Sequence, residues 1–273
     1  MNSFDKLIEW FVKNGDKAIV ALSGGVDSAV VALGARKSFG DNALAITADY
    51  KTLAGEELAI ARKVAIEIGI EHKVLEYDEL ANPEFVKNDE MRCYHCRTEL
   101  GRHLAEEGKK TGIALIVDGT NIDDLSDYRP GIRALRENGV RSPMVELGIS
   151  KQDIRDIAKN FGLSVYDKPS NACLASRIPT GHQVTYEKLH RIEIAEMIVK
   201  SMFGIKQVRV RDHGELARIE VGKDELQKMF DVDKLLILDG RLKEAGFKFV
   251  SVDTAGYRTG KMVVMDNEKP HLS

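Results

Sequence analysis

Residues 18–28 read Ala-Ile-Val-Ala-Leu-Ser-Gly-Gly-Val-Asp-Ser, and this is the most informative stretch of the chain. An apolar strand runs directly into Ser23-Gly24-Gly25, where two glycines let the backbone turn sharply and approach a ligand closely. A helical stretch follows at once, and the N–H groups at its start suit phosphate. Ser23 and Ser28 add hydroxyl donors, while the carboxylate of Asp27 can hold a Mg²⁺ ion that neutralises phosphate charge. The Walker pattern GxxxxGK[ST] is absent, so the segment predicts a different phosphate-binding loop.

Length and composition describe an ordinary globular protein. The 273 residues are 43% hydrophobic and 30% charged, and the net charge of −3 argues against a chain-wide attraction to nucleic acid. No run approaches the roughly 20 apolar residues that a membrane helix needs, and the N-terminus has no signal-peptide pattern. We therefore expect a cytoplasmic protein with neither a membrane nor a nucleic-acid partner.

Short apolar runs alternate with helical stretches through the first two-thirds of the chain. This rhythm predicts an α/β fold with a doubly wound parallel sheet, in which ligands bind at the carboxyl ends of the strands. The phosphate-binding loop, Asp49 and Gly119-Thr120-Asn121 all fall at such ends. The expected strands are 18–22, 43–49, 72–76 and 114–119, and the expected helices are 28–39, 55–68, 98–111 and 150–161.

The pattern changes near residue 183, where a long helix introduces two alternating strands, a helical region and a last strand. This order predicts a second, smaller α/β domain of the type α-β-β-α-β. We place the first domain at residues 1–182 and the second, which would serve the substrate or oligomerisation, at residues 183–273.

The chain has three cysteines, Cys93, Cys96 and Cys173, and an odd number argues against a disulfide framework. Cys93 and Cys96 form a C-x-x-C pair, which fits a metal centre, a redox dithiol or half of a zinc site. Cys173 is either an inert buried thiol or the third thiolate of one site. Zinc would take a fourth ligand from His95 or His103, whereas a [4Fe–4S] cluster would leave one iron open to sulfide.

Two further groups of polar residues are candidates for ligand binding. One group follows a strand beside the phosphate-binding loop and runs from Asp118 through Asp124 to Arg129. The alternative is an ordinary solvated loop, since Asp, Asn and Gly are common loop formers. Arg209 and Arg211 alternate on a strand, so both face one side, where they would bind phosphate or form a solvated surface. Glu196 lies on the preceding helix, within reach of that side.

Taken together, these motifs resemble the LarE family of ATP-dependent sulfur transferases, which help to build the nickel-pincer nucleotide cofactor. SGGVDS is similar to the PP-loop of the ATP pyrophosphatases, and the other segments narrow the resemblance to this family. It covers nearly the whole chain and implies an enzyme that adenylates a carboxylate of a pyridinium mononucleotide, releases pyrophosphate and inserts sulfur. The segments that carry it are SGGVDS at 23–28, RCYHC at 92–96, GTNIDDLSDYRPG at 119–131, DKPSNACLASRIPTG at 167–181 and VRVRDHGELARIEV at 208–221.

The resemblance also implies roles for single residues. In one branch of the family, which lacks the cysteine pair, the cysteine matching Cys173 gives up its own sulfur. The presence of Cys93 and Cys96 instead resembles the branch in which three cysteines hold a [4Fe–4S] cluster that carries hydrosulfide. Ser23, Asp27 and Cys173 would be catalytic; ATP and Mg²⁺ would contact Ser23, Gly24, Gly25, Val26, Asp27, Ser28, Asp49, Gly119, Thr120, Asp124 and Arg129; the substrate would contact Arg209, Arg211, Arg258 and Glu196.

Relatives of this kind imply a homo-oligomer that receives sulfide or another sulfur donor. Two rival functions fit parts of the same pattern. A tRNA thiolase would share the PP-loop and the cluster, and a nucleotide-binding scaffold with structural zinc would use the cysteines without catalysis.

Overall fold

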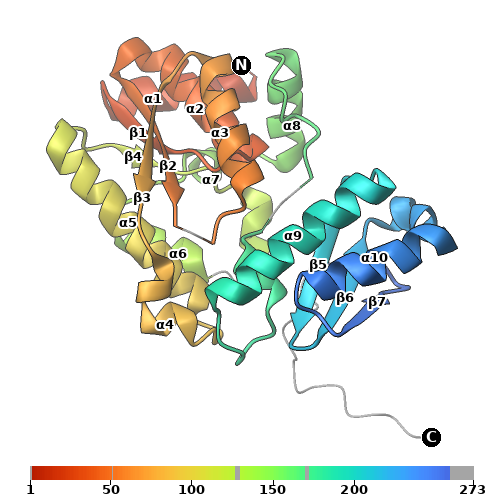
Figure 1. Ribbon diagram of the computed structural model, residues 1–273. Helices are drawn as coiled ribbons and strands as arrows, with labels where there is room; N and C mark the ends of the chain where they lie inside the picture. The colour runs from red at the N-terminus through yellow and green to blue at the C-terminus, as the bar shows by residue number, and fades with distance from the viewer. Residues whose placement is uncertain (1, 51, 127–129, 170–171, 259–273) are drawn as a thin grey trace, which may run out of the picture. The chain divides into compact units, whose positions relative to one another are not determined.

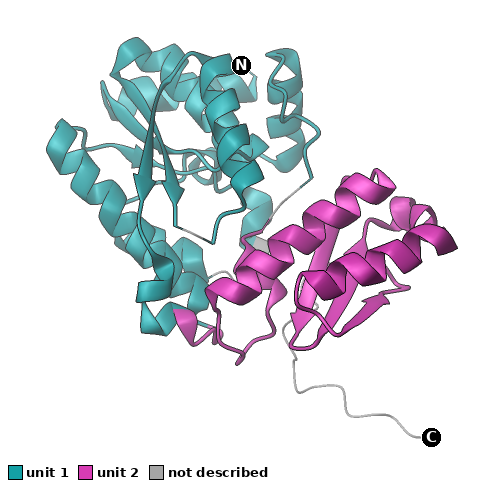
Figure 2. Ribbon diagram, in the orientation of Figure 1, with its two compact units in different colours: residues 1–85, 91–171 teal, residues 86–90, 172–273 magenta. Residues whose placement is uncertain are grey.

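The computed structural model describes residues 2–50, 52–126, 130–169 and 172–258 (Figure 1). The chain forms two compact units, and it passes between them more than once (Figure 2). Unit 1 comprises residues 1–85 and 91–171, and unit 2 comprises residues 86–90 and 172–273. The domain boundary expected after residue 182 therefore falls inside unit 2.

Unit 1 is built on a four-stranded parallel sheet, which confirms the predicted fold class. Its strands are β1 (Ala18–Ala21), β2 (Ala43–Asp49), β3 (Glu71–Glu76) and β4 (Ile116–Val117), in the order β3-β2-β1-β4. The strand expected over 114–119 is shorter, and on the side away from β1 it forms a single parallel bridge in which Asp118 N donates to Arg141 O at 2.9 Å. The phosphate-binding loop follows β1, which lies between β2 and β4.

Helices cover both faces of this sheet (Figure 1). Val20 of β1 packs into a core with Leu7, Phe11 and Val30, whereas its neighbour Ile19 packs into a separate core on the opposite face. This alternation is the expected result of a buried strand with apolar residues on both sides. The helices of unit 1 are α1 (Ser3–Asn14), α2 (Val26–Phe39), α3 (Gly55–Ile68), α4 (Pro83–Val86), α5 (Arg92–Thr111), α6 (Pro130–Glu137), α7 (Pro143–Glu146) and α8 (Lys151–Asn160).

Two helix starts bear directly on the candidate sites. Helix α5 begins at Arg92, earlier than the predicted start at residue 98, so both cysteines of the C-x-x-C pair lie on it. Helix α8 begins as predicted, because Ser150 caps it and forms a capping box with Asp153.

Unit 2 has the predicted order of elements. Its helices are α9 (Tyr186–Phe203) and α10 (Val232–Glu244), and its strands are β5 (Val208–His213), β6 (Leu216–Val221) and β7 (Phe249–Val252). The strand order is β5-β6-β7, with β6 antiparallel to β5 and parallel to β7. The expected helical region begins with a 3₁₀ helix, Lys223–Met229, ahead of α10.

Residues 86–90 join unit 2 although they precede the cysteine pair in sequence. Val86 O accepts a hydrogen bond from Val184 N at 2.9 Å. The buried Asn88 adopts a left-handed conformation, and its Nδ2 donates to Pro179 O and His182 O at 2.8 Å each. The chain therefore reaches Cys93 three residues after a segment that is bound into unit 2.

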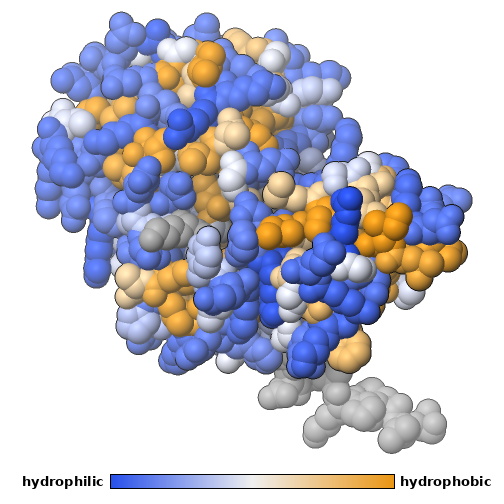
Figure 3. Space-filling model, in the orientation of Figure 1, coloured by the Kyte–Doolittle hydropathy of each residue, from blue (hydrophilic) through white to orange (hydrophobic). Residues whose placement is uncertain are grey.

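Unit 2 has exposed apolar side chains, and Figure 3 shows apolar surface on the face of unit 2 that is turned toward the viewer. None of the helices in the described residues has the length and apolar character that a membrane crossing requires. The large exposed apolar side chains on and beside α10 are Phe230, Val232, Leu236, Ile237 and Phe249.

Candidate functional site

The phosphate-binding loop turns sharply between β1 and α2. Gly24 has a φ of +74°, and a Cβ at this position would lie 2.9 Å from Glu57 O, so only glycine fits. Gly25 precedes the first helical residue, and no side chain in the described structure caps α2 there. The N–H groups of the first turn, together with the helix dipole, therefore form a site for an anion such as a phosphate group.

The two serines of the loop have different surroundings. Ser28 is buried, and its Oγ accepts from Ser23 N and donates to Gly25 O, both at 3.1 Å. Ser23 is exposed, and its Oγ lies 3.1 Å from that of Ser28. Ser28 therefore maintains the shape of the loop, and Ser23 presents its hydroxyl at the surface where a nucleotide would arrive.

The loop that follows β4 lies directly against the start of α2. A Cβ on Gly119 would lie 2.5 Å from Ser28 N, so the close approach of these two backbones requires glycine. Asn121 is buried, and its Nδ2 donates to Asp27 Oδ1 at 3.1 Å. The fold thus brings the polar segment after β4 to the phosphate-binding loop, as the parallel sheet predicted.

Two residues expected at the nucleotide have partners within their own loop. Thr120 Oγ1 donates to Asp118 Oδ2 at 2.5 Å, and Asp124 Oδ2 accepts from Asn121 N at 3.2 Å. Both side chains therefore order the loop around Asp27. Direct contact of either one with ATP stays a prediction.

Asp49 and Arg129 are the other two residues that were expected to contact the nucleotide. Asp49 is the last residue of β2, the strand next to β1, so it lies at the same carboxyl edge of the sheet as the loop. Arg129 lies outside the described residues.

Two lysines that sequence reasoning missed reach the phosphate-binding loop. Lys151 Nζ lies 2.7 Å and 2.5 Å from the two carboxylate oxygens of Asp27. Lys168 Nζ donates to Gly24 O at 3.0 Å and to the buried Glu57 at 2.5 Å. A lysine at the first position of a helix is unfavourable beside the helix dipole, and this was a signal that Lys151 has another partner.

The C-x-x-C pair lies at the start of α5 beside a buried carboxyl group. Cys93 is exposed, and Cys96 is half-buried. Burial raises the pKa of Glu79, and hydrogen bonds from Cys96 and Thr52 partly oppose this effect. Thiolates are the donors that zinc and iron–sulfur clusters take, so the donor chemistry of the pair fits either centre.

The two histidines considered as zinc ligands have other neighbours in unit 1. His95 Nε2 is 3.9 Å from Glu84 Oε2, and the ring of His103 stacks on Tyr77 at 4.4 Å. Within the described part of either unit, no three His, Cys, Asp or Glu side chains gather in a metal-binding group. Cys173 belongs to unit 2.

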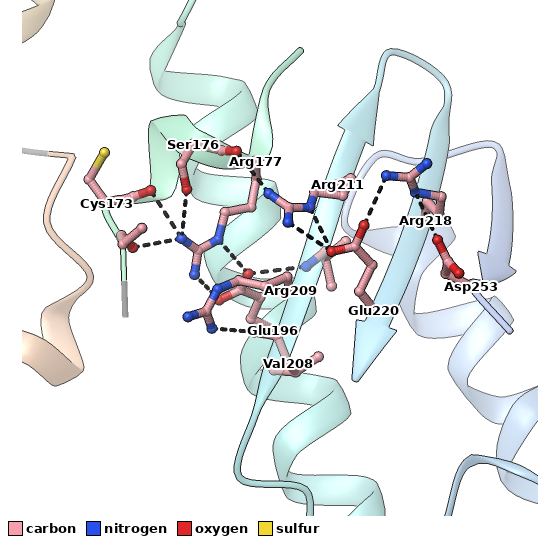
Figure 4. A network of polar contacts seen from close by, with 12 residues as sticks. Cys173, Ser176, Arg177, Glu196, Val208, Arg209, Arg211, Arg218, Glu220 and Asp253 are labelled. Atoms are coloured by element: carbon pink, nitrogen blue, oxygen red, sulfur yellow. Dashed lines mark hydrogen bonds and ion pairs between the residues drawn. The ribbon is translucent and has the colours of Figure 1, made fainter. Parts of the chain in front are cut away.

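Unit 2 contains a buried network of arginines and carboxylates (Figure 4). Arg211 donates through Nε and Nη2 to Glu220 Oε2 at 2.9 Å and 2.8 Å, and Arg218 Nη2 donates to the other oxygen at 2.9 Å. Arg209 and Arg211 are 4% and 5% exposed, so the alternative of a solvated strand surface is wrong. Burying charges is costly unless they are paired, which explains the density of ion pairs here.

Arg177 connects this network to the segment that carries Cys173 (Figure 4). Its fully buried guanidinium donates to both oxygens of Glu196, at 2.8 Å and 3.1 Å. Its Nη1 donates to Ala172 O at 2.6 Å and to Cys173 O at 3.0 Å. Glu196 therefore acts first as the partner of Arg177, and this pair holds the backbone of Cys173.

Two buried arginines of unit 2, Arg177 and Arg209, lie close enough to affect one another electrostatically. Burial and the neighbouring Arg177 lower the pKa of Arg209 to about 10, although Glu196 and Tyr257 oppose the shift. The guanidinium of Arg209 lies 5.2 Å from the ring centre of Tyr257, and the adjacent Arg258 is exposed. A bound anion would offset the charge that Arg209 and Arg177 share.

Comparisons with known proteins match most of the chain. A family described as "Queuosine biosynthesis protein QueC" matches residues 17–97. An uncharacterized protein of Synechocystis is 44% identical over 90% of this chain and 92% of its own length. The pyridinium-3,5-bisthiocarboxylic acid mononucleotide synthase of Lactiplantibacillus plantarum is 30% identical over 92% of this chain and 90% of its own. A tRNA-specific 2-thiouridylase of Wolbachia is 29% identical, over 57% of this chain and 52% of its own.

Proposed function

This chain belongs to the LarE family of PP-loop ATP-dependent sulfur transferases, and from that premise we propose that it converts a carboxylate of a pyridinium mononucleotide into a thiocarboxylate. The main support for the proposal is that one chain contains two features suited to binding anions. Unit 1 has an uncapped helix start at the PP-loop, and unit 2 has buried arginines, one of which binds the backbone of Cys173. The first suits ATP, and the second suits a substrate that carries its own phosphate.

The first step is adenylation. A substrate carboxylate oxygen attacks the α-phosphorus of ATP, a P–O bond forms, and the bond to pyrophosphate breaks. The start of α2 and the hydroxyl of Ser23 stabilise the charge that develops on the leaving pyrophosphate. Asp27 would hold the Mg²⁺ that accompanies ATP, since carboxylate oxygens are the ligands this ion prefers.

In the second step sulfur attacks the activated acyl carbon, a C–S bond forms, and AMP leaves with the oxygen. Cys93, Cys96 and Cys173 would hold a [4Fe–4S] cluster, which when bound offers an iron position open to exogenous sulfide. Cys93 and Cys96 belong to unit 1 and Cys173 belongs to unit 2, so the grouping of the three around one cluster is what the family resemblance implies.

The arginines of unit 2 would bind the phosphate of the mononucleotide. Arg209, Arg211 and Arg258 are the candidates, and Glu196 positions Cys173 through Arg177. The lowered pKa of Arg209 supports this role, because a doubly charged phosphate would relieve the repulsion between Arg209 and Arg177.

The experiment that tests this function is ATP–pyrophosphate exchange with the full chain and defined substrates. We expect a carboxylated pyridinium mononucleotide to stimulate exchange, and tRNA to give no stimulation at any salt concentration. Exchange stimulated by tRNA, together with salt-dependent tRNA binding, would establish the thiolase alternative instead.

Replacing Arg209 with glutamine separates recognition of the substrate from recognition of ATP. We expect R209Q to raise the KM for the mononucleotide about 100-fold, because a charge-assisted hydrogen bond to phosphate is lost from a buried site. The KM for ATP should stay unchanged. Arg241, exposed on α10, provides the matched control R241Q. An unchanged mononucleotide KM in R209Q would remove Arg209 from the substrate site.

Three further points stay predictions. We expect sulfide or another compound to donate the sulfur, the protein to be cytoplasmic, and the chain to form a homo-oligomer. The exposed apolar side chains on and beside α10 would provide a contact between copies. Sedimentation of the full chain at several concentrations measures the oligomeric state directly.

A further inference from the structure

Lys151 forms an ion pair with Asp27, the carboxylate that would bind Mg²⁺. Its Nζ contacts both oxygens of Asp27, at 2.7 Å and 2.5 Å, and Asn121 Nδ2 donates to the first of them at 3.1 Å. The single ammonium group of Lys151 therefore contacts both oxygens of the Asp27 carboxylate. A hydrated divalent cation therefore competes directly with Lys151 for Asp27.

The surrounding contacts hold the backbone of Lys151, whereas its side chain is partly exposed. The backbone N–H donates to Asp123 Oδ2 at 2.6 Å, and Ser150 caps the helix immediately before it. The side chain of Lys151 is 34% exposed and that of Asp27 is 25% exposed, so the pair is reached by solvent. An ammonium group on a flexible stem of four carbons can change partners within such a site without a change in the backbone.

The position of Lys151 also suits a second partner. It is the first residue of α8, where the helix dipole disfavours a cation, and its ammonium group lies at Asp27 in the first turn of α2. Phosphate groups bound at the start of α2 would therefore lie next to it. A lysine that Mg²⁺ displaces from Asp27 has those phosphate oxygens as its nearest alternative anion.

We propose that Lys151 is an exchangeable counter-ion of Asp27. Without nucleotide it holds the carboxylate and excludes divalent cations; when ATP arrives with its metal ion, Lys151 passes to the phosphate oxygens that leave as pyrophosphate. The inference rests on the proposed adenylation function. It adds an order of binding, in which Asp27 takes a metal ion only together with nucleotide.

The test is the binding of Mn²⁺ to the full chain without nucleotide, followed by electron paramagnetic resonance. We expect K151Q to bind Mn²⁺ at least about tenfold more tightly than the unchanged chain, because the competing cation is gone. K151R keeps a cation and should bind Mn²⁺ weakly. Lys159, exposed near the end of the same helix, provides the control K159Q, which should match the unchanged chain. Since Ser150 and Asp153 cap α8 independently of Lys151, we expect K151Q to fold.

The substrate-stimulated exchange rate distinguishes this inference from the proposed function. We expect K151Q to lose about 100-fold in that rate, as on removal of one cationic group from developing charge. If K151Q gains no affinity for Mn²⁺, the counter-ion role is wrong even if exchange falls. If the unchanged chain shows no stimulated exchange while K151Q gains Mn²⁺, the counter-ion role stands and the proposed function fails.

Discussion

Replacing Asp27 with alanine is expected to lower substrate-stimulated ATP–pyrophosphate exchange by at least about 1,000-fold. The variant loses the carboxylate on which Asn121 and Lys151 converge and which would hold the Mg²⁺ of ATP. The fold should persist, because Asp27 is partly exposed and the turn depends on Gly24 and Ser28. Exchange measured with radiolabelled pyrophosphate tests the loss, and circular dichroism tests the fold.

Two further variants test whether the loss of exchange in D27A comes from the missing charge of Asp27. Asp41 lies just after α2 with a side chain that is 98% exposed, so D41A removes an aspartate of the same region without touching the loop. D27N keeps the shape of the side chain but not its charge, and we expect it to be nearly as inactive as D27A. Exchange that persists in D27A would show that the phosphate-binding loop has been misassigned.

Replacing Cys173 with alanine is expected to abolish sulfur transfer while substrate-stimulated exchange continues. In the proposed mechanism adenylation depends on the PP-loop of unit 1, whereas Cys173 belongs to unit 2, where Arg177 holds its backbone carbonyl. Since that contact involves the main chain, C173A keeps the Arg177–Glu196 pair and should fold. The measurement is thiocarboxylate formation by mass spectrometry, in parallel with exchange. Loss of both activities would contradict the separation of the two steps.

Metal analysis after anaerobic reconstitution with iron and sulfide identifies what the cysteines hold. We expect about four iron atoms per chain, and a large loss of iron in C93A, C96A and C173A alike. H95A is the control, because a cluster held by three thiolates leaves His95 unused, whereas a zinc site would lose a ligand. Zinc without iron would exclude the cluster. A chain that loses the mass of one H₂S after a single turnover would instead identify Cys173 as a sacrificial donor.

The fold was largely predictable because its signals are local. Alternating apolar runs and helical stretches predicted the parallel sheet of unit 1, and a change of pattern near residue 183 predicted the order of elements in unit 2. Boundaries were less predictable. The start of α5 at Arg92 was missed because RCYHC has no helical apolar spacing, and β4 is shorter than the apolar run that predicted it.

The candidate nucleotide site was predictable in part. Ser23 to Ser28 form the expected turn, and Asn121 reaches Asp27 because parallel strands end at one edge of the sheet. The partners of Asp27 were not all predictable. Lys151 lies 124 residues from Asp27 in sequence, and no spacing rule connects a lysine to a carboxylate at that separation.

Short runs of residue types were enough to predict the fold class and the phosphate-binding loop, and they suggested the three cysteines as the proposed site of sulfur transfer. Only the tertiary structure decided which charges meet. It paired Lys151 with Asp27, Lys168 with Glu57, and Arg177 with Glu196. These pairs depend on how helices and strands pack over long separations in sequence. For the buried Arg177 and Glu196, the cost of burying an unpaired charge is the physical reason that a partner is needed.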